Sequence, residues 1–277
     1  MRIEPHSTFN QEMFTVTADS GIRPLEGRAA LVTGAARNVG RAIALRLASE
    51  GARVVVNARS DAEAAQSVVD EIEATGGKAV AALGDITDPE AVTSLVATAR
   101  ETVGPLTIVV CNAAIRSAAR IREIEHEEWD ATIKTTLYGA FYCVKACLDD
   151  MIDAGFGRVV AISGDGPHEG MAGHAHVGAA KFGLEGLMRG LATELGGHGI
   201  TVNTVSPGIV ATTRTFTSEV HRARLQEQIA ASLGSNPLGR AIEATEIADL
   251  VAYLASPNAR FISGQTVHAN GGGYHGY

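Results

Sequence analysis

Short apolar runs alternate with helical patterns from residue 28 to the end of the chain. The runs lie at 29–33, 53–57, 78–82, 107–111, 158–163, 200–205 and 265–269. Several are apolar at consecutive positions, as in Val54-Val55-Val56 and Val159-Val160-Ala161-Ile162, which is typical of parallel strands covered on both faces. Because helical stretches separate the strands, we expect βαβ units. The pattern therefore predicts an α/β protein with a doubly wound sheet of about seven parallel strands and helices on both faces.

The same pattern indicates how the domain is organised. Residues 1–26 lack periodicity and are interpreted as an N-terminal extension, either disordered or packed on a neighbouring subunit. Helices are predicted over 61–75 and 88–103, each between a polar N-cap and a glycine. The chain has no internal repeat and no low-complexity tract, so residues 27–277 are predicted to form one domain.

Composition and charge exclude several classes of protein. Of the 277 residues, 45% are apolar and 19% are charged, which is ordinary for a globular protein. The chain carries 23 basic and 31 acidic residues, a net charge of −8, with its basic residues scattered, so no nucleic-acid partner is expected. No apolar run reaches the ~18 residues that span a bilayer. Cys111, Cys143 and Cys147 lie in apolar segments, which favours free thiols in a cytoplasmic protein.

A glycine turn follows the first predicted strand. It reads Thr33-Gly34-Ala35-Ala36-Arg37-Asn38-Val39-Gly40 and precedes a helical pattern from Ala42 to Ala48. Such a turn presents backbone N–H groups and the positive end of a helix dipole to a phosphate. The strand before it and the helix after it are the context in which the turn indicates nucleotide binding. The alternative interpretation is a tight βα turn without a ligand.

Together with motifs further along the chain, this turn resembles the short-chain dehydrogenase/reductase family, whose turn reads Thr-Gly-x-x-x-Gly-x-Gly. The other matching segments are Asp85-Ile86, Cys111-Asn112-Ala113-Ala114, Ser206-Pro207-Gly208 with Thr212, and Ile262-Ser263-Gly264-Gln265 with Gly271-Gly272. The resemblance implies a single Rossmann-like domain and a nicotinamide cofactor. The cofactor-binding residues that it implies are Gly34, Arg37, Asn38, Val39, Gly40, Arg59, Asp85, Ile86, Asn112, Lys181, Pro207, Gly208 and Thr212.

Two positions bear on how the cofactor would bind. Asn38 stands where the family has its middle glycine, and the turn is expected to survive because Asn tolerates positive φ. At the end of the second strand, NAD-specific relatives place a carboxylate at the position that aligns with Ala58. Arg59 follows, and its guanidinium can form a charge-assisted fork with a 2′-phosphate. We therefore predict NADP(H), with NAD(H) as the less favoured alternative; Arg59 as a solvated surface residue is the competing interpretation.

The catalytic positions depart from the family pattern. In the family, Tyr-x-x-x-Lys puts a phenol and an ammonium on one helix face, so that the phenol can exchange a proton with the substrate oxygen. Lys181 matches the lysine, but Val177 stands at the tyrosine position and Gly164 at the serine position. The family's helix asparagine aligns with Thr136. No tyrosine occurs between residues 157 and 195, so no shift of the alignment restores the phenol.

Three histidines close to this position are candidates for the missing proton donor: His168, His174 and His176. If the helix reaches back to His174, that residue lies within about 20° of the face of Lys181, whereas His176 lies about 140° away. His174 is therefore the preferred proton donor and His176 the second choice. Polar residues on a surface loop are the alternative interpretation. No second cluster of ligands accompanies them, so no metal site is expected.

The resemblance also implies a substrate-covering lid and an assembly. The lid falls at about 213–240, where Arg214, His221, Arg222 and Arg224 are candidates to meet an anionic substrate, although a solvated helix face is the commoner explanation. The run from Phe261 to Gly273 resembles the segment that family members bury between subunits. We therefore expect a homo-oligomer, either a tetramer or a dimer.

These features predict an NADP(H)-dependent oxidoreductase with an altered catalytic site and a small-molecule substrate. Reduction of a simple ketone creates an alkoxide that a proton donor must stabilise. Hydride addition to a conjugated C=C, a quinone-like ring or an imine demands less of that donor, and a carbonyl substrate also stays open. His174 or water would supply the proton. Two alternatives remain: a catalytically silent NADP(H)-binding protein, and a non-redox lyase or isomerase on the same scaffold.

Overall fold

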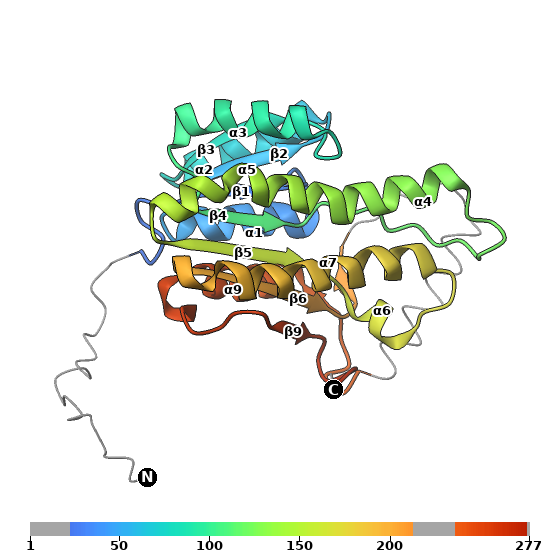
Figure 1. Cartoon of the computed structure of the whole chain (residues 1–277). Helices are drawn as coiled ribbons and strands as arrows, with labels where there is room; N and C mark the ends of the chain where they lie inside the picture. Colours follow the sequence, from blue (N-terminus) through green and yellow to red (C-terminus); the bar gives the residue numbers. More distant parts are fainter. Residues whose placement is uncertain (1–22, 213–235, 276–277) are drawn as a thin grey trace, which may run out of the picture.

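A single parallel sheet organises the chain. The computed structural model describes residues 23–212 and 236–275 (Figure 1). Seven strands within these residues form the sheet in the order β3-β2-β1-β4-β5-β6-β9, which confirms the predicted doubly wound, Rossmann-like α/β fold. All seven predicted runs end within two residues of an observed strand end. The strands are Ala29–Val32 (β1), Arg53–Ala58 (β2), Lys78–Leu83 (β3), Ile108–Cys111 (β4), Gly157–Ile162 (β5), Ile200–Pro207 (β6) and Thr266–Ala269 (β9).

Helices cover both faces of the sheet (Figure 1). One face carries α1 (Asn38–Ser49), α2 (Ala62–Ala74) and α9 (Ala244–Ala255), and the other carries α3 (Pro89–Val103), α5 (Gly139–Asp153) and α7 (Ala175–Leu195). The strands are apolar throughout because alternate side chains enter different cores. In β2, Val54 and Val56 pack with α1, α2 and α9, whereas Val55 packs with α3 and α5. Among the described residues, none of these helices has the length and apolar character needed to cross a membrane.

The shorter elements lie mainly at the carboxyl ends of the strands. Helix α4 (His126–Ile133) passes through a π-helical turn (Lys134–Tyr138) into α5, and α6 (Asp165–Glu169) follows β5. Two 3-10 turns, Gly196–His198 and Pro257–Ala259, follow α7 and α9. Strands β7 (Val210–Ala211) and β8 (Ile242–Glu243) pair outside the main sheet. With two residues each, they have no periodicity for a sequence pattern to reveal.

The strand order gives the sheet a switch point between β1 and β4, where a ligand-binding crevice is expected beyond the carboxyl ends of the strands. From β1 the chain runs outward through β2 to β3, then returns to the other side of β1 at β4. The loops after β1 and β4 therefore leave in opposite directions, and ligands of such sheets bind at this switch point. In Figure 1 the arrows of β4 and β5 point toward the side of the molecule that carries α6.

The predicted N-terminal extension and the predicted lid are each described only in part by the structure. Most of the predicted extension (1–22) and most of the predicted lid (213–235, including Arg214, His221, Arg222 and Arg224) lie outside the described residues. Leu25, which the sequence placed in the extension, is fully buried, and its N–H donates to Glu50 O at 2.9 Å. The packed part of the chain therefore includes Leu25.

Gly139, the first residue of α5, packs closely against Ile86, and this contact can be tested by substitution. A Cβ on Gly139 would lie 2.5 Å from Ile86 Cδ1 and 2.8 Å from its Cγ1. We predict that Gly139→Ala lowers the free energy of unfolding by about 1–3 kcal/mol, because Ile86 must shift. Ile86→Ala removes the clashing atoms, so the double variant should lose less stability than the two single variants together. Urea denaturation of all four proteins measures this coupling, and additive losses would contradict the contact.

Candidate functional site

The turn between β1 and α1 has the backbone that its sequence predicts. Gly34 has φ of +61° and Asn38 has φ of +49°, the single positive φ among the described non-glycine residues. This confirms that Asn accommodates the left-handed conformation at the middle glycine position. A Cβ on Gly40 would lie 2.3 Å from Gly34 O and 2.6 Å from Asn112 Nδ2. Only glycine therefore allows α1 to begin so close to the sheet.

Side chains from the neighbouring strands hold this turn in place. Asn112, at the end of β4, donates its Nδ2 to Thr33 O at 2.9 Å and to Gly34 O at 3.1 Å. Thr33 Oγ1 accepts from the N–H of Asn112 at 3.0 Å. On the other side, Asn57 Oδ1 accepts from the N–H of Gly34 at 3.4 Å, and its Nδ2 donates to Ala82 O at 3.1 Å. Asn57 was not among the predicted site residues, although an amide inside an apolar strand is a recognisable signal.

The N-terminus of α1 is open to a ligand. Arg37 is the N-cap residue but its side chain makes no capping hydrogen bond, and the first turn holds no acidic residue. No acidic side chain in the first turn neutralises the positive end of the helix dipole, which favours an anion there. Arg37 Nη2 instead pairs with Asp61 Oδ2 at 3.1 Å. Val39 is buried beneath the turn, and Arg59 is exposed just after β2.

The remaining predicted cofactor residues lie on the loops after β3 and β6. Asp85 Oδ1 accepts from the N–H of Thr87 at 2.9 Å and from its hydroxyl at 2.8 Å, and Ile86 is buried. Pro207 ends β6, and the N–H of Gly208 donates to Ala269 O at 3.1 Å. The hydroxyl of Thr212 is buried and has no hydrogen-bond partner among the described residues.

Lys181 is the buried cation of the site. Its side chain projects from α7, is nearly inaccessible, and donates from Nζ to Ile162 O at 2.6 Å. Burial lowers the pKa of Lys181 to about 7, helped by the charge of Arg116 and opposed by Glu185 and Cys111. Since the unfolded chain would hold this proton up to the ordinary lysine range, the contribution of Lys181 to stability rises with pH above about 7. Val177, one turn earlier, is also buried.

The three candidate histidines have different environments. His174 would share the face of Lys181 if the helix reached back to it. In the structure α7 begins at Ala175 and His174 is its N-cap residue, whose carbonyl accepts from the N–H of Gly178 at 2.7 Å. Its Nδ1 lies 3.2 Å from Ala172 O. The surface-loop interpretation is wrong for the other two histidines, because the side chains of His168 and His176 are only 9% and 0% exposed.

His176 on α7 and Thr136 in the π-helical turn are both buried polar residues. His176 Nε2 lies 2.9 Å from Ser117 Oγ and 3.8 Å from Glu128 Oε1. Burial lowers the pKa of His176, against the opposing charge of Glu128. Thr136 lies in the π-helical turn, and neither its hydroxyl nor His176 Nδ1 has a hydrogen-bond partner within the described part of the chain. Such π-helical turns frequently occur at functional sites.

Two histidines and two carboxylates form a cluster that begins at Asp165, the residue after Gly164: His168, His268, Asp165 and Glu185. His268 Nδ1 lies 2.8 Å from Asp165 Oδ1, which also accepts from Ser206 Oγ at 2.7 Å. His168 Nε2 lies 2.8 Å from Glu185 Oε1, and the two imidazole rings meet edge to face at 4.9 Å. The pairing of His268 with Asp165 could not be found from the sequence, since the two residues are 103 positions apart and no local spacing connects them. No group of three side chains in the described ranges is arranged to hold a metal ion.

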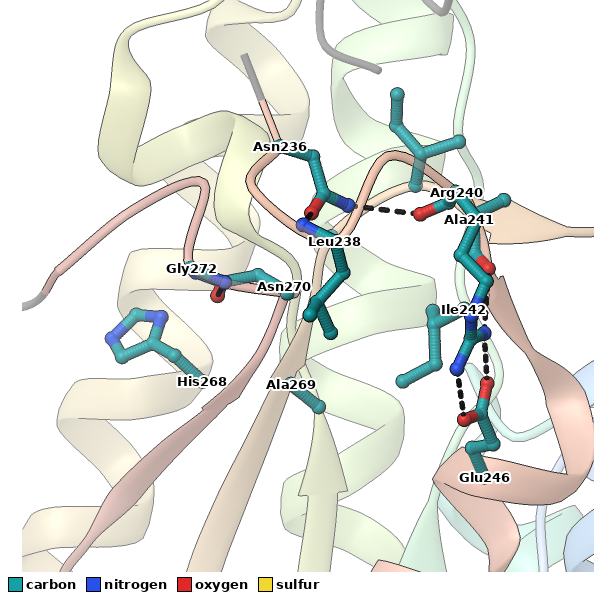
Figure 2. Close-up of a pocket in the computed structure, with 13 residues that line it drawn as sticks. Asn236, Leu238, Arg240, Ala241, Ile242, Glu246, His268, Ala269, Asn270 and Gly272 are labelled. Atoms are coloured by element: carbon teal, nitrogen blue, oxygen red, sulfur yellow. Dashed lines mark hydrogen bonds and ion pairs between the residues drawn. The ribbon is translucent and has the colours of Figure 1, made fainter. Parts of the chain in front are cut away.

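A cavity of about 230 Å³ lies where β6 and β9 end. Figure 2 shows Arg240 paired with Glu246 on one side of it, and His268 on the other. Both guanidinium Nη atoms donate to the carboxylate at 2.7 Å. Asn236 Nδ2 donates to Arg240 O at 2.8 Å, so this end of the predicted lid is fixed to its own loop. Gly208 also lines the cavity, which therefore adjoins the predicted cofactor segment.

The three cysteines are free and buried, as predicted. Cys111 ends β4 beside Lys181, and burial raises the pKa of its thiol to about 12. Cys143 and Cys147 lie on the buried face of α5, and burial raises the pKa of both thiols well above the ordinary value. None of the three is therefore a thiolate near neutral pH.

Comparison with known proteins relates this site to characterised reductases. The profile of a family described as enoyl-(acyl carrier protein) reductase matches residues 34–275. The 3-oxoacyl-(acyl carrier protein) reductase of Escherichia coli (strain K12) is 39% identical over 249 residues, which are 90% of this chain and 98% of that protein. The reductase of the same name from Staphylococcus aureus (strain N315) is 37% identical over 247 residues, 89% of this chain and 98% of its own.

A solved structure agrees over the same range. It is described as a short-chain alcohol dehydrogenase from Sinorhizobium meliloti 1021, and it superposes with a TM-score of 0.84 at 35% sequence identity. The superposition covers 91% of this chain and 98% of that one.

Proposed function

Because this chain belongs to the short-chain dehydrogenase/reductase family and is an oxidoreductase of that type, we propose that it uses NADP(H) and has an altered catalytic site. Its substrate would be a small molecule with a conjugated C=C, a quinone-like ring, an imine or an activated carbonyl. The observation that carries this proposal is the surroundings of Lys181: a buried lysine next to the nucleotide crevice, with Val177 one turn before it.

The geometry of the crevice fits a dinucleotide. Gly34 and Gly40 leave the space that a backbone needs to approach a pyrophosphate, and the uncapped start of α1 offers N–H groups to it. When bound, the nicotinamide supplies or accepts the hydride. Arg59 would hold the 2′-phosphate, with Arg37 beside it, and Ile86 would line the adenine site. Lys181 would hold the nicotinamide ribose.

The altered catalytic positions favour a substrate that needs little acid catalysis. A Cβ on Gly164 would meet one atom within 4 Å, Pro207 O at 3.8 Å, so a serine would fit there and its absence is not forced by packing. Ser163, next to it, does not take over, because its hydroxyl donates to Glu185 at 2.7 Å. Thr136, at the helix asparagine position, has a hydroxyl that is free to join a proton path to Lys181.

His174 remains our candidate proton donor. It is only partly buried at the start of α7, so it can exchange protons with solvent, whereas His176 is fully buried and lies against Ser117. An imidazole is suited to this role because it titrates near neutral pH.

We also propose that the chain forms a homo-oligomer, a tetramer or a dimer. Aromatic side chains are exposed on neighbouring helices of one face: Trp129 on α4, Phe141 on α5 and Phe182 on α7. Phe261 is exposed before β9. Apolar side chains gathered on one face are typical of a surface that a partner covers, and closed symmetric assemblies are the usual partner.

The cofactor assignment can be tested by binding measurements. We predict that NADPH binds at least tenfold more tightly than NADH, because Arg59 pairs with the 2′-phosphate; a tenfold ratio is about 1.4 kcal/mol. Arg59→Ala should bring the two affinities together, while Arg23→Ala, which alters an exposed arginine away from the crevice, should not. Calorimetry measures the six constants, two for each of the three proteins. Equal affinities in the wild type would overturn the assignment.

The reaction can be tested with a substrate panel. We expect NADPH oxidation with at least one enone, quinone or imine and little with simple ketones, because no phenol is present to protonate an alkoxide. Val177→Tyr combined with Gly164→Ser should then add activity toward ketones. If neither protein oxidises NADPH with any substrate although both bind it, the silent binding protein becomes the better account.

The same substrate identifies the proton donor. His174→Ala should lower kcat by roughly 10²–10⁴ and leave NADPH affinity unchanged, with loss of the limb of the pH profile in the histidine range. His176→Ala is the matched control and should affect kcat less. Full activity of His174→Ala would assign the proton to water, to Thr136 or to the substrate itself.

The assembly can be tested by light scattering. We predict a species of two or four chains at micromolar concentration, because the exposed aromatic face would be covered. A particle of 28.8 kDa, the mass of one chain, would contradict this.

A further inference from the structure

Lys181 has an acidic neighbour one turn after it on α7, whereas the family pattern places a tyrosine one turn before it. One turn before it on α7 stands Val177, and one turn after it stands Glu185. All three side chains are buried, and Glu185 is only 1% exposed. Residues four apart lie on the same side of a helix. Glu185 is therefore the carboxylate on this face of α7 that is nearest in sequence to the lysine.

Four side chains surround the Glu185 carboxylate, three from outside α7 and one from α7 itself. Ser163 Oγ donates to Oε1 at 2.7 Å, and His168 Nε2 lies 2.8 Å from the same atom. Thr266 Oγ1 lies 3.4 Å from Oε2, and Arg189 Nη2 lies 3.5 Å from it. A carboxylate can only accept hydrogen bonds, so His168 donates from Nε2. With its oxygens engaged in this way, the carboxylate is fixed in position and acts on Lys181 through its charge.

The backbone connects this carboxylate to the lysine a second time. Lys181 Nζ donates to Ile162 O, and the next residue, Ser163, donates to Glu185. The end of β5 therefore holds both side chains of α7 with two consecutive residues. Any shift of this strand end would move the ammonium and the carboxylate together.

We propose that Glu185 is a positioning residue for Lys181: held by Ser163 and His168, it favours the charged form of the lysine and keeps its side chain in place at the end of β5. Its importance for the reaction rests on the proposed function, in which Lys181 holds the cofactor. In this chain Glu185 would balance the lysine charge from one turn after it, since Val177 offers no acidic group one turn before it.

The charges around Lys181 make its protonation sensitive to this neighbour. Arg116, from the loop after β4, opposes the lysine charge, while Glu185 on α7 supports it. Cys111 at the end of β4 is held as a neutral thiol by burial, so it adds no charge near neutral pH. The burial of Lys181 lowers its pKa to about 7, so small changes in these charges alter its protonation at neutral pH. His168 on α6 lies against Glu185 and adds a second titratable group to the same network.

The experiment is a pH titration of Lys181 by NMR in the protein without nucleotide. The chain has four lysines, Lys78, Lys134, Lys145 and Lys181, so 13Cε-labelled lysine gives few signals, and Lys181→Arg assigns the one of interest. We expect Glu185→Gln to lower the titration midpoint of Lys181 by about one pH unit, because the charge that favours the ammonium is lost while the shape is kept. Arg116→Gln should raise the midpoint.

Glu194→Gln is the matched control, the same substitution at an exposed position on the same helix, and should leave the midpoint unchanged. A role of Glu185 in folding alone would lower the unfolding temperature and leave the midpoint of Lys181 where it is, which would overturn the proposal. If Glu185→Gln does not fold, Glu185→Asp withdraws the carboxylate by one methylene and should lower the midpoint by a smaller amount; an unchanged midpoint there would overturn it equally.

A second measurement separates this inference from the proposed function. NADPH fluorescence titrations at several pH values should show affinity falling as Lys181 loses its proton, and falling at lower pH in Glu185→Gln than in the wild type. If no nicotinamide nucleotide binds at any pH, the proposed function fails. The NMR midpoints do not depend on nucleotide, so they still decide whether Glu185 sets the charge of Lys181.

Discussion

The first turn of α1 sits so close to the ends of β1 and β4 that residue 40 has no room for a β-carbon. This approach brings the N-terminus of the helix to the switch point of the sheet, where the chain leaves β1 in one direction and β4 in the other. Asn57 and Asn112 then fix the turn from both sides. The crevice is therefore formed by backbone that side chains from β2 and β4 hold rigid, and it is preorganised before any ligand arrives.

The charged side chains Lys181 and Glu185 are buried and are stabilised by one another's neighbours. Lys181 is removed from water, which disfavours its ammonium, and the protein compensates with a strand-end carbonyl and a carboxylate one turn away. The same carboxylate is saturated by a hydroxyl and an imidazole. Buried ionisable groups are costly unless each has partners. Here each group in the network serves as a partner for the next one, which connects α6 and α7 to the ends of β5 and β9.

The sequence predicted those parts of the molecule that periodicity and local turn chemistry determine. The seven strands, the glycine turn and the positive φ of Asn38 follow from apolar runs and from residues that neighbour one another in the chain. The buried histidines did not follow, because the partners of His168 come from α7, about one helix length away, and His268 meets Asp165 across 103 residues. Contacts of that kind depend on how β5, β6 and β9 pair with one another, and this register cannot be predicted from the local pattern of one sequence.

The start of α7 illustrates the same division at the scale of one residue. The helical pattern is clear, yet the sequence does not show whether the helix includes His174; in the structure the helix begins at Ala175 and His174 is its N-cap residue. Helix ends depend on capping and on what packs around them, so they are the least predictable part of an otherwise regular element. Candidate residues near such an end need the structure before their geometry can be used.

The burial of all three cysteines has a practical consequence for studying this protein. Thiol reagents react with the thiolate, which is the nucleophile. Cys111, Cys143 and Cys147 are buried, and burial also keeps them in the thiol form. A cysteine introduced on the surface would therefore react with a maleimide dye or spin label without removal of the native residues. Pairs of such labels at exposed positions of two helices, such as α3 and α9, would show whether the distance between these helices changes when a ligand binds.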